Sequence, residues 1–260
     1  MKLHYFYDPL CGWCYGASPL LQAVAALPGV SVEMHAGGML DESEGRTITP
    51  DWRSYVMPHD KRIAQMSGQP FGDAYYDGLL NDIGAPLASN PAIAAVLAAD
   101  KLGIAPLAML ARIQRAHYQE GRRIAEFAVL SELAVELGAD AGVFQAAWQP
   151  AREDAEKHID DTRRRMGQLA CAVSVGGAGA GWPAGAPGVV GWFGKPAQLA
   201  AALAERLPKP AAAATTRCSA RRKAAADFLA AFWPPPTPGG GFFRAAGGYS
   251  PASWIGWISG

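Results

Sequence analysis

Cysteine is scarce in this chain of 260 residues, which contains four, at positions 11, 14, 171 and 218. So few cysteines exclude a disulfide-rich scaffold, and a chain of this length can bury an ordinary hydrophobic core without cross-links. Charge is sparse too, because charged residues make up 18% and the 23 basic side chains balance the 23 acidic ones. A net charge of zero argues against a broad basic face, so we expect no nucleic-acid partner.

Long apolar runs are also missing. No stretch approaches the roughly 18 uninterrupted apolar residues that a membrane-spanning helix needs. The first residues are strand-like and stop at Asp8-Pro9, before the apolar region and cleavage site of a secretory signal could form. We therefore expect a cytoplasmic protein with no membrane partner.

Hydrophobic periodicity predicts an α/β fold. A strand over residues 2–7 is followed by a helical pattern over 11–27 and by an alternating strand pattern over 30–35. Helix signals then dominate residues 45–169, and the last of these helices is expected at 153–169. This arrangement indicates a strand–helix–strand unit into which a large helical domain is inserted. Beyond it, the pattern predicts a short strand at 189–193 and a helix at 196–207.

The motif that carries chemistry is Cys11-Gly12-Trp13-Cys14, which follows the first strand and opens the first helix. At a helix N-terminus, Cys11 faces unpaired backbone N–H groups and the positive end of the dipole, which stabilise a thiolate. Cys14 lies one turn later, within reach of a disulfide to Cys11. The first sulfur attacks a disulfide and forms a mixed disulfide, which the second sulfur resolves. The residues between and beside them, Gly12, Trp13 and Tyr15, are expected to tune the redox potential and shape a substrate surface.

The same motif is open to other interpretations, because Cys-x-x-Cys also begins zinc sites. A tetrahedral zinc site needs two further ligands. Cys171 and Cys218 are unpaired in the sequence, and the five histidines show no metal-ligand spacing. Two merely structural cysteines are a further alternative. We favour redox chemistry and expect no metal and no bound cofactor, with glutathione as a candidate co-substrate.

The residues around this motif resemble the DsbA-like thioredoxin superfamily, in the cytoplasmic branch known as predicted protein-disulfide isomerases. The matching stretches are 7–16, 37–40, 55–60, 68–72 and 113–118. The resemblance runs from residue 1 to about residue 169. It implies a thioredoxin-like fold with a large inserted helical domain, in which Cys11 is the nucleophile and Cys14 the resolving thiol.

The chain departs from this family pattern over residues 170–188. Such proteins carry a loop after the last inserted helix whose cis-proline packs against the two sulfurs. Here the expected place, near residues 173–177, holds no proline, and Pro183 is the nearest substitute. We hypothesise a compensated frameshift at 170–174 and a second near residue 208. Loss of the proline loop predicts impaired activity.

The domain prediction follows from these stretches. Residues 1–40 and 170–207 are expected to form the thioredoxin-like domain, and 41–169 the helical insertion. Residues 208–260 combine an alanine run with proline and glycine clusters, and are expected to be an irregular or disordered tail.

A few polar residues of the insertion are weaker candidates for the site. His59, Asp60 and Arg62 lie in one helical stretch, and His117 with Tyr118 lies in another. Each set could face the sulfurs, or could merely cap a helix or form its solvent-exposed face.

The function expected is thiol–disulfide exchange on a protein or small-thiol substrate, with an oligomeric state that the sequence leaves unknown. Reductase or isomerase activity is expected over net oxidation, because a cytosolic glutathione pool is reducing. Two alternatives stay open. One is a glutathione-dependent isomerase or transferase of the kappa-like branch, and the other is a degenerate, non-catalytic binding module.

Overall fold

The computed structural model describes residues 1–169, 189–207 and 257–259. Its elements, in chain order, are β1 (Lys2–Tyr7), α1 (Gly12–Ala25), β2 (Ser31–Ala36), η1 (Glu42–Glu44), α2 (Pro50–Ser67), η2 (Ala74–Gly78), η3 (Leu79–Asn81), α3 (Asn90–Lys101), α4 (Pro106–Tyr118), α5 (Phe127–Glu136), α6 (Ala141–Leu169), η4 (Val189–Trp192), α7 (Pro196–Ala204) and β3 (Trp257–Ser259). Here η2 is one π-helical turn, and the other η elements are 3-10 turns.

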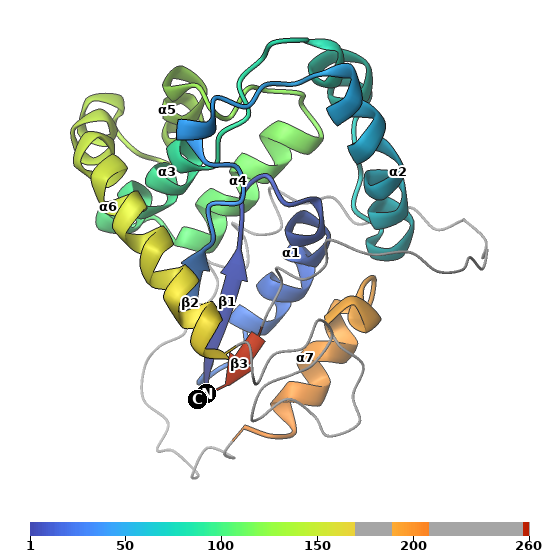
Figure 1. The fold of residues 1–260 in the computed structure, drawn as a ribbon. Coiled ribbons are helices and arrows are strands. Elements are labelled where there is room, and N and C mark those ends of the chain that lie inside the picture. Colours follow the sequence, from blue (N-terminus) through green and yellow to red (C-terminus); the bar gives the residue numbers. More distant parts are fainter. Residues whose placement is uncertain (170–188, 208–256, 260) are drawn as a thin grey trace. The chain divides into compact units, whose positions relative to one another are not determined.

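The sheet confirms the predicted strand–helix–strand unit. β1 and β2 pair in parallel through the crossover helix α1, and β3 pairs antiparallel with β1, so the strand order is β2-β1-β3 (Figure 1). Because successive side chains of a strand point to opposite faces, Leu3, Tyr5 and Tyr7 share one face. His4 and Phe6 share the other. Tyr5 reaches α1, where its hydroxyl donates to the carbonyl oxygen of Cys14 at 3.5 Å.

The insertion between β2 and residue 170 is helical, as predicted, and α2 begins at a capping signal. Thr49 caps α2, because its Oγ1 accepts a hydrogen bond from the backbone N–H of Trp52 at 3.1 Å, and Pro50 occupies the first helical position. The last helix is longer than predicted. α6 begins at Ala141 and continues through Pro150, whereas the charge pattern predicted a start near residue 153.

Helix α1 lies at the centre of the packing that positions the cysteines. It contacts α2 and α4 of the insertion and also α7, while α6 packs on α3 and on β2 (Figure 1). Leu20, Leu21 and Val24 of this helix are all buried, and Leu27, which shares their spacing in the sequence, lies beyond the helix end and is half-buried.

One strand prediction is wrong. The expected strand at 189–193 is the 3-10 turn η4, after which the N–H of Phe193 donates back to the carbonyl oxygen of Val190 at 3.2 Å. In the tail, residues 257–259 form β3, whose backbone pairs with the open edge of β1. The rest of the tail, Pro183 and the segment 170–188 lie outside the described residues. None of the described peptide bonds is cis.

Among the described helices, none combines the length and the apolar character that a bilayer crossing requires.

Two glycines let the η2 segment approach the end of α4. The N–H of Gly72 donates to the carbonyl oxygen of Tyr118 at 2.9 Å. A Cβ atom at Gly72 would lie 2.1 Å from the backbone oxygen of Gln119, and one at Gly121 would lie 2.1 Å from that of Ala74. Gly121 also has a φ of +65°, which L-residues adopt with strain. Neither position has room for a side chain.

We expect Gly72→Ala to lower the free energy of unfolding by about 2–4 kcal/mol, because backbone must move to admit the methyl group. Urea denaturation followed by circular dichroism measures this loss. Gly167→Ala is the matched control, since the added Cβ in α6 meets nothing within 4 Å. The control should be neutral or up to about 1 kcal/mol stabilising. Equal midpoints for the two variants would contradict the close approach at Gly72.

Candidate active site

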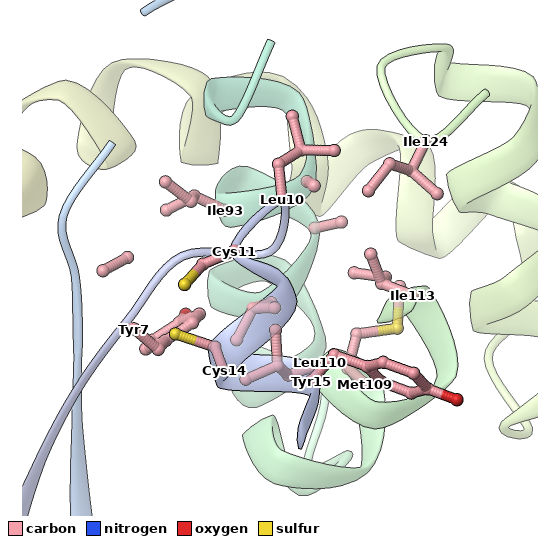
Figure 2. Packing of buried hydrophobic residues seen from close by; sticks show 14 of the residues in the cluster. Tyr7, Leu10, Cys11, Cys14, Tyr15, Ile93, Met109, Leu110, Ile113 and Ile124 are labelled. Carbon is pink, nitrogen blue, oxygen red and sulfur yellow. The ribbon is translucent and has the colours of Figure 1, made fainter. Parts of the chain in front are cut away.

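The two cysteines lie at the junction of β1 and α1. Cys11 is the residue that caps the helix, with extended backbone angles (φ −89°, ψ 109°), and Cys14 lies in the first turn. Both are free thiols and both are buried, Cys11 at 5% and Cys14 at 0% exposure. Figure 2 shows their two sulfur atoms side by side at the start of α1.

The two thiols differ in their surroundings. Cys11 lines a cavity and stands next to the unpaired N–H groups of the first helical turn. Cys14 faces inward, and burial raises its pKa well above the usual value. A hydrogen bond with the sulfur of Cys11 raises it further. Cys14 is therefore held as a neutral thiol, beside a sulfur that is open to a substrate.

The loop that carries Cys11 is fixed by the buried carboxylate of Asp8. Its Oδ1 accepts from the N–H of Leu10 at 2.9 Å and from the hydroxyl of Ser89 at 2.8 Å. Its Oδ2 accepts from the N–H of Met39 at 2.7 Å. Burial raises the pKa of Asp8, and these three hydrogen bonds oppose that shift. Sequence analysis treated Asp8 only as the end of a strand, although an Asp before a turn is a known signal for such backbone contacts.

Gly12 is required because helix α2 lies against it. A Cβ atom at this position would come within 2.8 Å of Asp60 Oδ1 and 3.0 Å of Ile63 Cδ1. Asp60 therefore packs against Gly12, the residue after Cys11. Of the two alternatives left open for this residue, its side chain faces the cysteine motif.

Trp13 and Tyr15 take different positions. Trp13 lines the cavity, with its ring centroid 6.0 Å from that of Phe193, and its Nε1 has no hydrogen-bond partner among the described residues. Tyr15 is buried beneath the insertion, where its hydroxyl donates to the carbonyl oxygen of Pro70 and accepts from Gln119 Nε2, each at 2.6 Å. Tyr15 thus anchors the insertion to α1, and does not occupy the substrate surface on which it was predicted.

The cavity over Cys11 has a volume of about 380 Å³. It is lined from the cysteine loop by Leu10, Cys11, Gly12 and Trp13, and from the following segments by Met39, Leu40, Arg46, Trp52, Tyr55, Val56, His59, Asp60, Ile63, Tyr75, Leu87, His117 and Tyr118. Of the weaker candidates, His59, Asp60, His117 and Tyr118 are therefore at the site. Arg62 does not line it.

Among the titratable groups of this lining whose pKa burial shifts, Asp60 and His117 change their protonation nearest to neutral pH. Asp60 accepts a hydrogen bond from the hydroxyl of Tyr75 at 2.8 Å, but burial dominates and raises its pKa to about 7. Burial lowers the pKa of His117 to about 4, so this imidazole is neutral near pH 7. Its Nδ1 has no partner among the described residues. The cavity thus combines a nucleophilic sulfur with a carboxyl group that gains and loses a proton near neutrality.

The cysteine pair is not part of a metal centre within the described residues. Tetrahedral zinc needs four ligands, and no third His, Cys, Asp or Glu ligand atom there is grouped with the two sulfurs.

Comparison with known proteins points to disulfide chemistry. The cytosolic disulfide reductase DsbM from Pseudomonas aeruginosa has 46% sequence identity and a TM-score of 0.68, over 79% of this chain and 98% of that one. A structure of DsbM with GSH has 43% sequence identity and a TM-score of 0.68, and it also covers 79% of this chain and 98% of that one. A candidate protein disulfide isomerase from Nitrosomonas europaea shares 25% identity, at a TM-score of 0.56, over 65% of this chain and 79% of that one. No curated protein sequence matches.

A family described as the DSBA-like thioredoxin domain matches residues 2–178. That range includes the strand–helix–strand unit, the cysteine motif and the whole described insertion. The sequence-based resemblance and the predicted thioredoxin-like fold with a helical insertion are therefore confirmed. The chain belongs to the DSBA-like thioredoxin domain family, whose members are thiol–disulfide oxidoreductases.

Proposed function

We propose that this protein is a cytoplasmic disulfide reductase in which Cys11 attacks the substrate disulfide and Cys14 releases the product. The observation that carries the proposal is the unequal placement of two free thiols, one lining a cavity and one behind it. The similarity to cytosolic DsbM supports reduction over oxidation. A reducing glutathione pool, near −220 to −320 mV by the two kinds of measurement, favours the same direction.

The reaction follows from these positions. The thiolate of Cys11 forms a bond to one sulfur of the substrate disulfide, and the other sulfur leaves as a thiolate. Cys14 then attacks the Cys11 sulfur of the mixed disulfide, and the second substrate sulfur leaves while Cys14 gives up its proton. The products are two substrate thiols and an enzyme disulfide. Two equivalents of a thiol must reduce that disulfide before the next cycle: two glutathione molecules serve when the substrate is a protein disulfide, whereas glutathione disulfide as substrate requires a different reductant, such as a dithiol.

The cavity supports a peptide-like disulfide, such as glutathione disulfide or a glutathionylated protein, as substrate. Two of its buried polar atoms, Trp13 Nε1 and His117 Nδ1, lack partners among the described residues. An unsatisfied buried polar group costs about 1–3 kcal/mol. Amide and carbonyl groups of a bound peptide could satisfy both. Arg46 and His59 line the same cavity and supply partners for the carboxylates of glutathione.

Asp60 is the proton donor in this proposal. Its carboxyl group packs against Gly12 in a cavity wall and is half protonated near neutrality. Transfer of its proton to the leaving thiolate releases that product as a neutral thiol. The Asp60 carboxylate then takes a proton from solvent before the next cycle.

Cys11→Ser should lower the rate of insulin reduction by dithiothreitol to the uncatalysed rate, because the attacking sulfur is lost. Cys14→Ser should instead accumulate a mixed disulfide with glutathione, since nothing resolves it. Mass spectrometry without reductant measures the added glutathionyl group, and an insulin turbidity assay measures turnover. Equal residual turnover in the two variants, or a trapped adduct in Cys11→Ser, would overturn the assigned roles.

Asp60→Asn should lower kcat/KM for glutathione disulfide about tenfold, a modest loss because thiolates leave readily without an acid. We expect the activity of the parent protein to fall as pH rises through about 7, because Asp60 loses its proton, and this fall should be absent in the variant. The matched control is Asp77→Asn, an exposed acid outside the cavity. A pH profile of Asp60→Asn that superimposes on the parent profile would contradict proton donation.

Asp60 also predicts a pH-dependent stability. Its carboxyl has a pKa of about 7 in the folded protein and about 4 when unfolded. Its stabilising contribution is therefore complete below pH 4 and is lost as pH rises through 7, by at most about 4 kcal/mol. Urea denaturation at pH 5 and pH 8 should show a smaller loss for Asp60→Asn than for the parent. A larger loss in the variant would show that the carboxylate is stabilised when charged.

The two alternatives from the sequence have direct tests. A kappa-like enzyme would isomerise a chromene-type substrate with glutathione, whereas a binding module would turn over neither that substrate nor insulin. The predicted loss of activity through residues 170–188 also stays a prediction, because Pro183 lies outside the described residues.

A further inference from the structure

Three potential metal ligands from β1 and β2 meet on the sheet face opposite the cysteines. His4 Nδ1 lies 2.9 Å from His35 Nε2. The carboxylate of Glu33 lies 3.6 Å from His35 Nε2 through Oε1 and 3.9 Å from His4 Nδ1 through Oε2. The parallel register pairs His4 with Glu33, and His35 follows two residues later on the same face of β2.

The two imidazoles meet edge to edge. Their ring centroids are 5.2 Å apart and their planes differ by 23°. With the nitrogens at 2.9 Å, this geometry directs the two nitrogen atoms at each other. One proton shared between them accounts for the contact. A metal ion in the place of that proton requires the two rings to turn, so that each nitrogen lone pair points at the ion.

We propose that His4, Glu33 and His35 bind a divalent transition-metal ion of the zinc type, which takes the place of the proton shared by the two imidazoles. A tetrahedral zinc ion at about 2.0–2.1 Å from its ligands holds their atoms about 3.3 Å apart. The separation of 2.9 Å between the two imidazole nitrogens is shorter than that value. The separations from the Glu33 carboxylate to His35 and His4, 3.6 and 3.9 Å through its two oxygens, are longer. Imidazole and carboxylate are ligands that zinc accepts, and water completes such three-ligand sites.

The neighbouring cations set the affinity. Lys2 forms an ion pair with Glu33, and its side chain is 55% exposed, so it is free to leave the carboxylate for water. Arg165 and His158 act on His35 from α6. Because the positive charges of Lys2 and Arg165 compete with a metal ion, we expect a dissociation constant in the micromolar range.

The position of the site gives the ion a structural consequence. β1 leads into the Asp8 turn and Cys11, and β2 leads into Met39, whose N–H binds Asp8. An ion held by His4 and His35 cross-links the two strands that carry these loops. Zinc is therefore expected to raise the melting temperature of the full chain.

Zinc binding to the full chain tests the site, with Cys11→Ser/Cys14→Ser as the parent so that the redox dithiol does not compete. Calorimetric titration should show one zinc ion per chain that His4→Ala and Glu33→Gln each weaken at least tenfold. Lys2→Ala should bind zinc more tightly, because the competing ammonium is gone. That gain of affinity separates ligation from a loss of folding.

His59→Ala is the matched control, since it removes a histidine from the cavity over Cys11, on the opposite side of the sheet from His4, and should leave zinc affinity unchanged. Circular dichroism checks that each variant is folded. Absence of zinc binding in the parent would overturn the proposal, as would equal affinity in the parent, His4→Ala and Glu33→Gln. Weaker binding by Lys2→Ala would also contradict it. The test does not depend on turnover, so it stands apart from the proposed reductase activity.

Discussion

The buried carboxylate of Asp8 is the interaction on which the active-site geometry depends. It joins the cysteine loop, the segment after β2 and Ser89 through three hydrogen bonds. A carboxylate taken from water is costly unless donors replace its hydration, and here three donors do so. Without Asp8, the N–H groups of Leu10 and Met39 and the Ser89 hydroxyl would lose their common acceptor. The loop between β1 and α1 would then no longer be held over the cavity.

With that loop held, deeper burial and the hydrogen bond to Cys11 distinguish Cys14 from the chemically identical side chain of Cys11. Cys14 faces Tyr5 and the sheet, where a charge is unfavourable, and its pKa is raised. Cys11 lines the cavity beneath Asp60. Asp60 is itself buried, so its proton is available near neutral pH. The insertion therefore supplies a titratable group to the cavity as well as covering it, because α2 places the Asp60 carboxyl group next to Gly12.

Local features of this protein could be predicted from its sequence, and long-range ones could not. The strand–helix–strand unit, the cap at Thr49 and the Cys11/Cys14 pair depend on residues a few positions apart. The expected cap at Asn90 is wrong, because Asn90 is the first residue of α3 and Ser89 precedes it without a side-chain cap hydrogen bond. Asp60 lies 48 residues from Gly12, and no local pattern shows that α2 packs there. Tyr15 was misplaced for the same reason, since Pro70 and Gln119 capture its hydroxyl from distant segments. Strand β3 depends on an edge of β1 that the tail sequence does not reveal.

The histidines of β1 and β2 show why ligand spacing alone can mislead. His4 and His35 are 31 residues apart, a separation that no zinc motif of short spacing describes. Parallel pairing brings them together, because a crossover helix of any length can join two strands in the same register. The strand alternation then divides the functions of β1 between two faces. Tyr5 and Tyr7 lie on the face toward the thiols. His4 lies on the other face, beside Glu33 and His35. One strand can thus pack against the cysteine motif with one face and present the proposed metal ligand His4 on the other face.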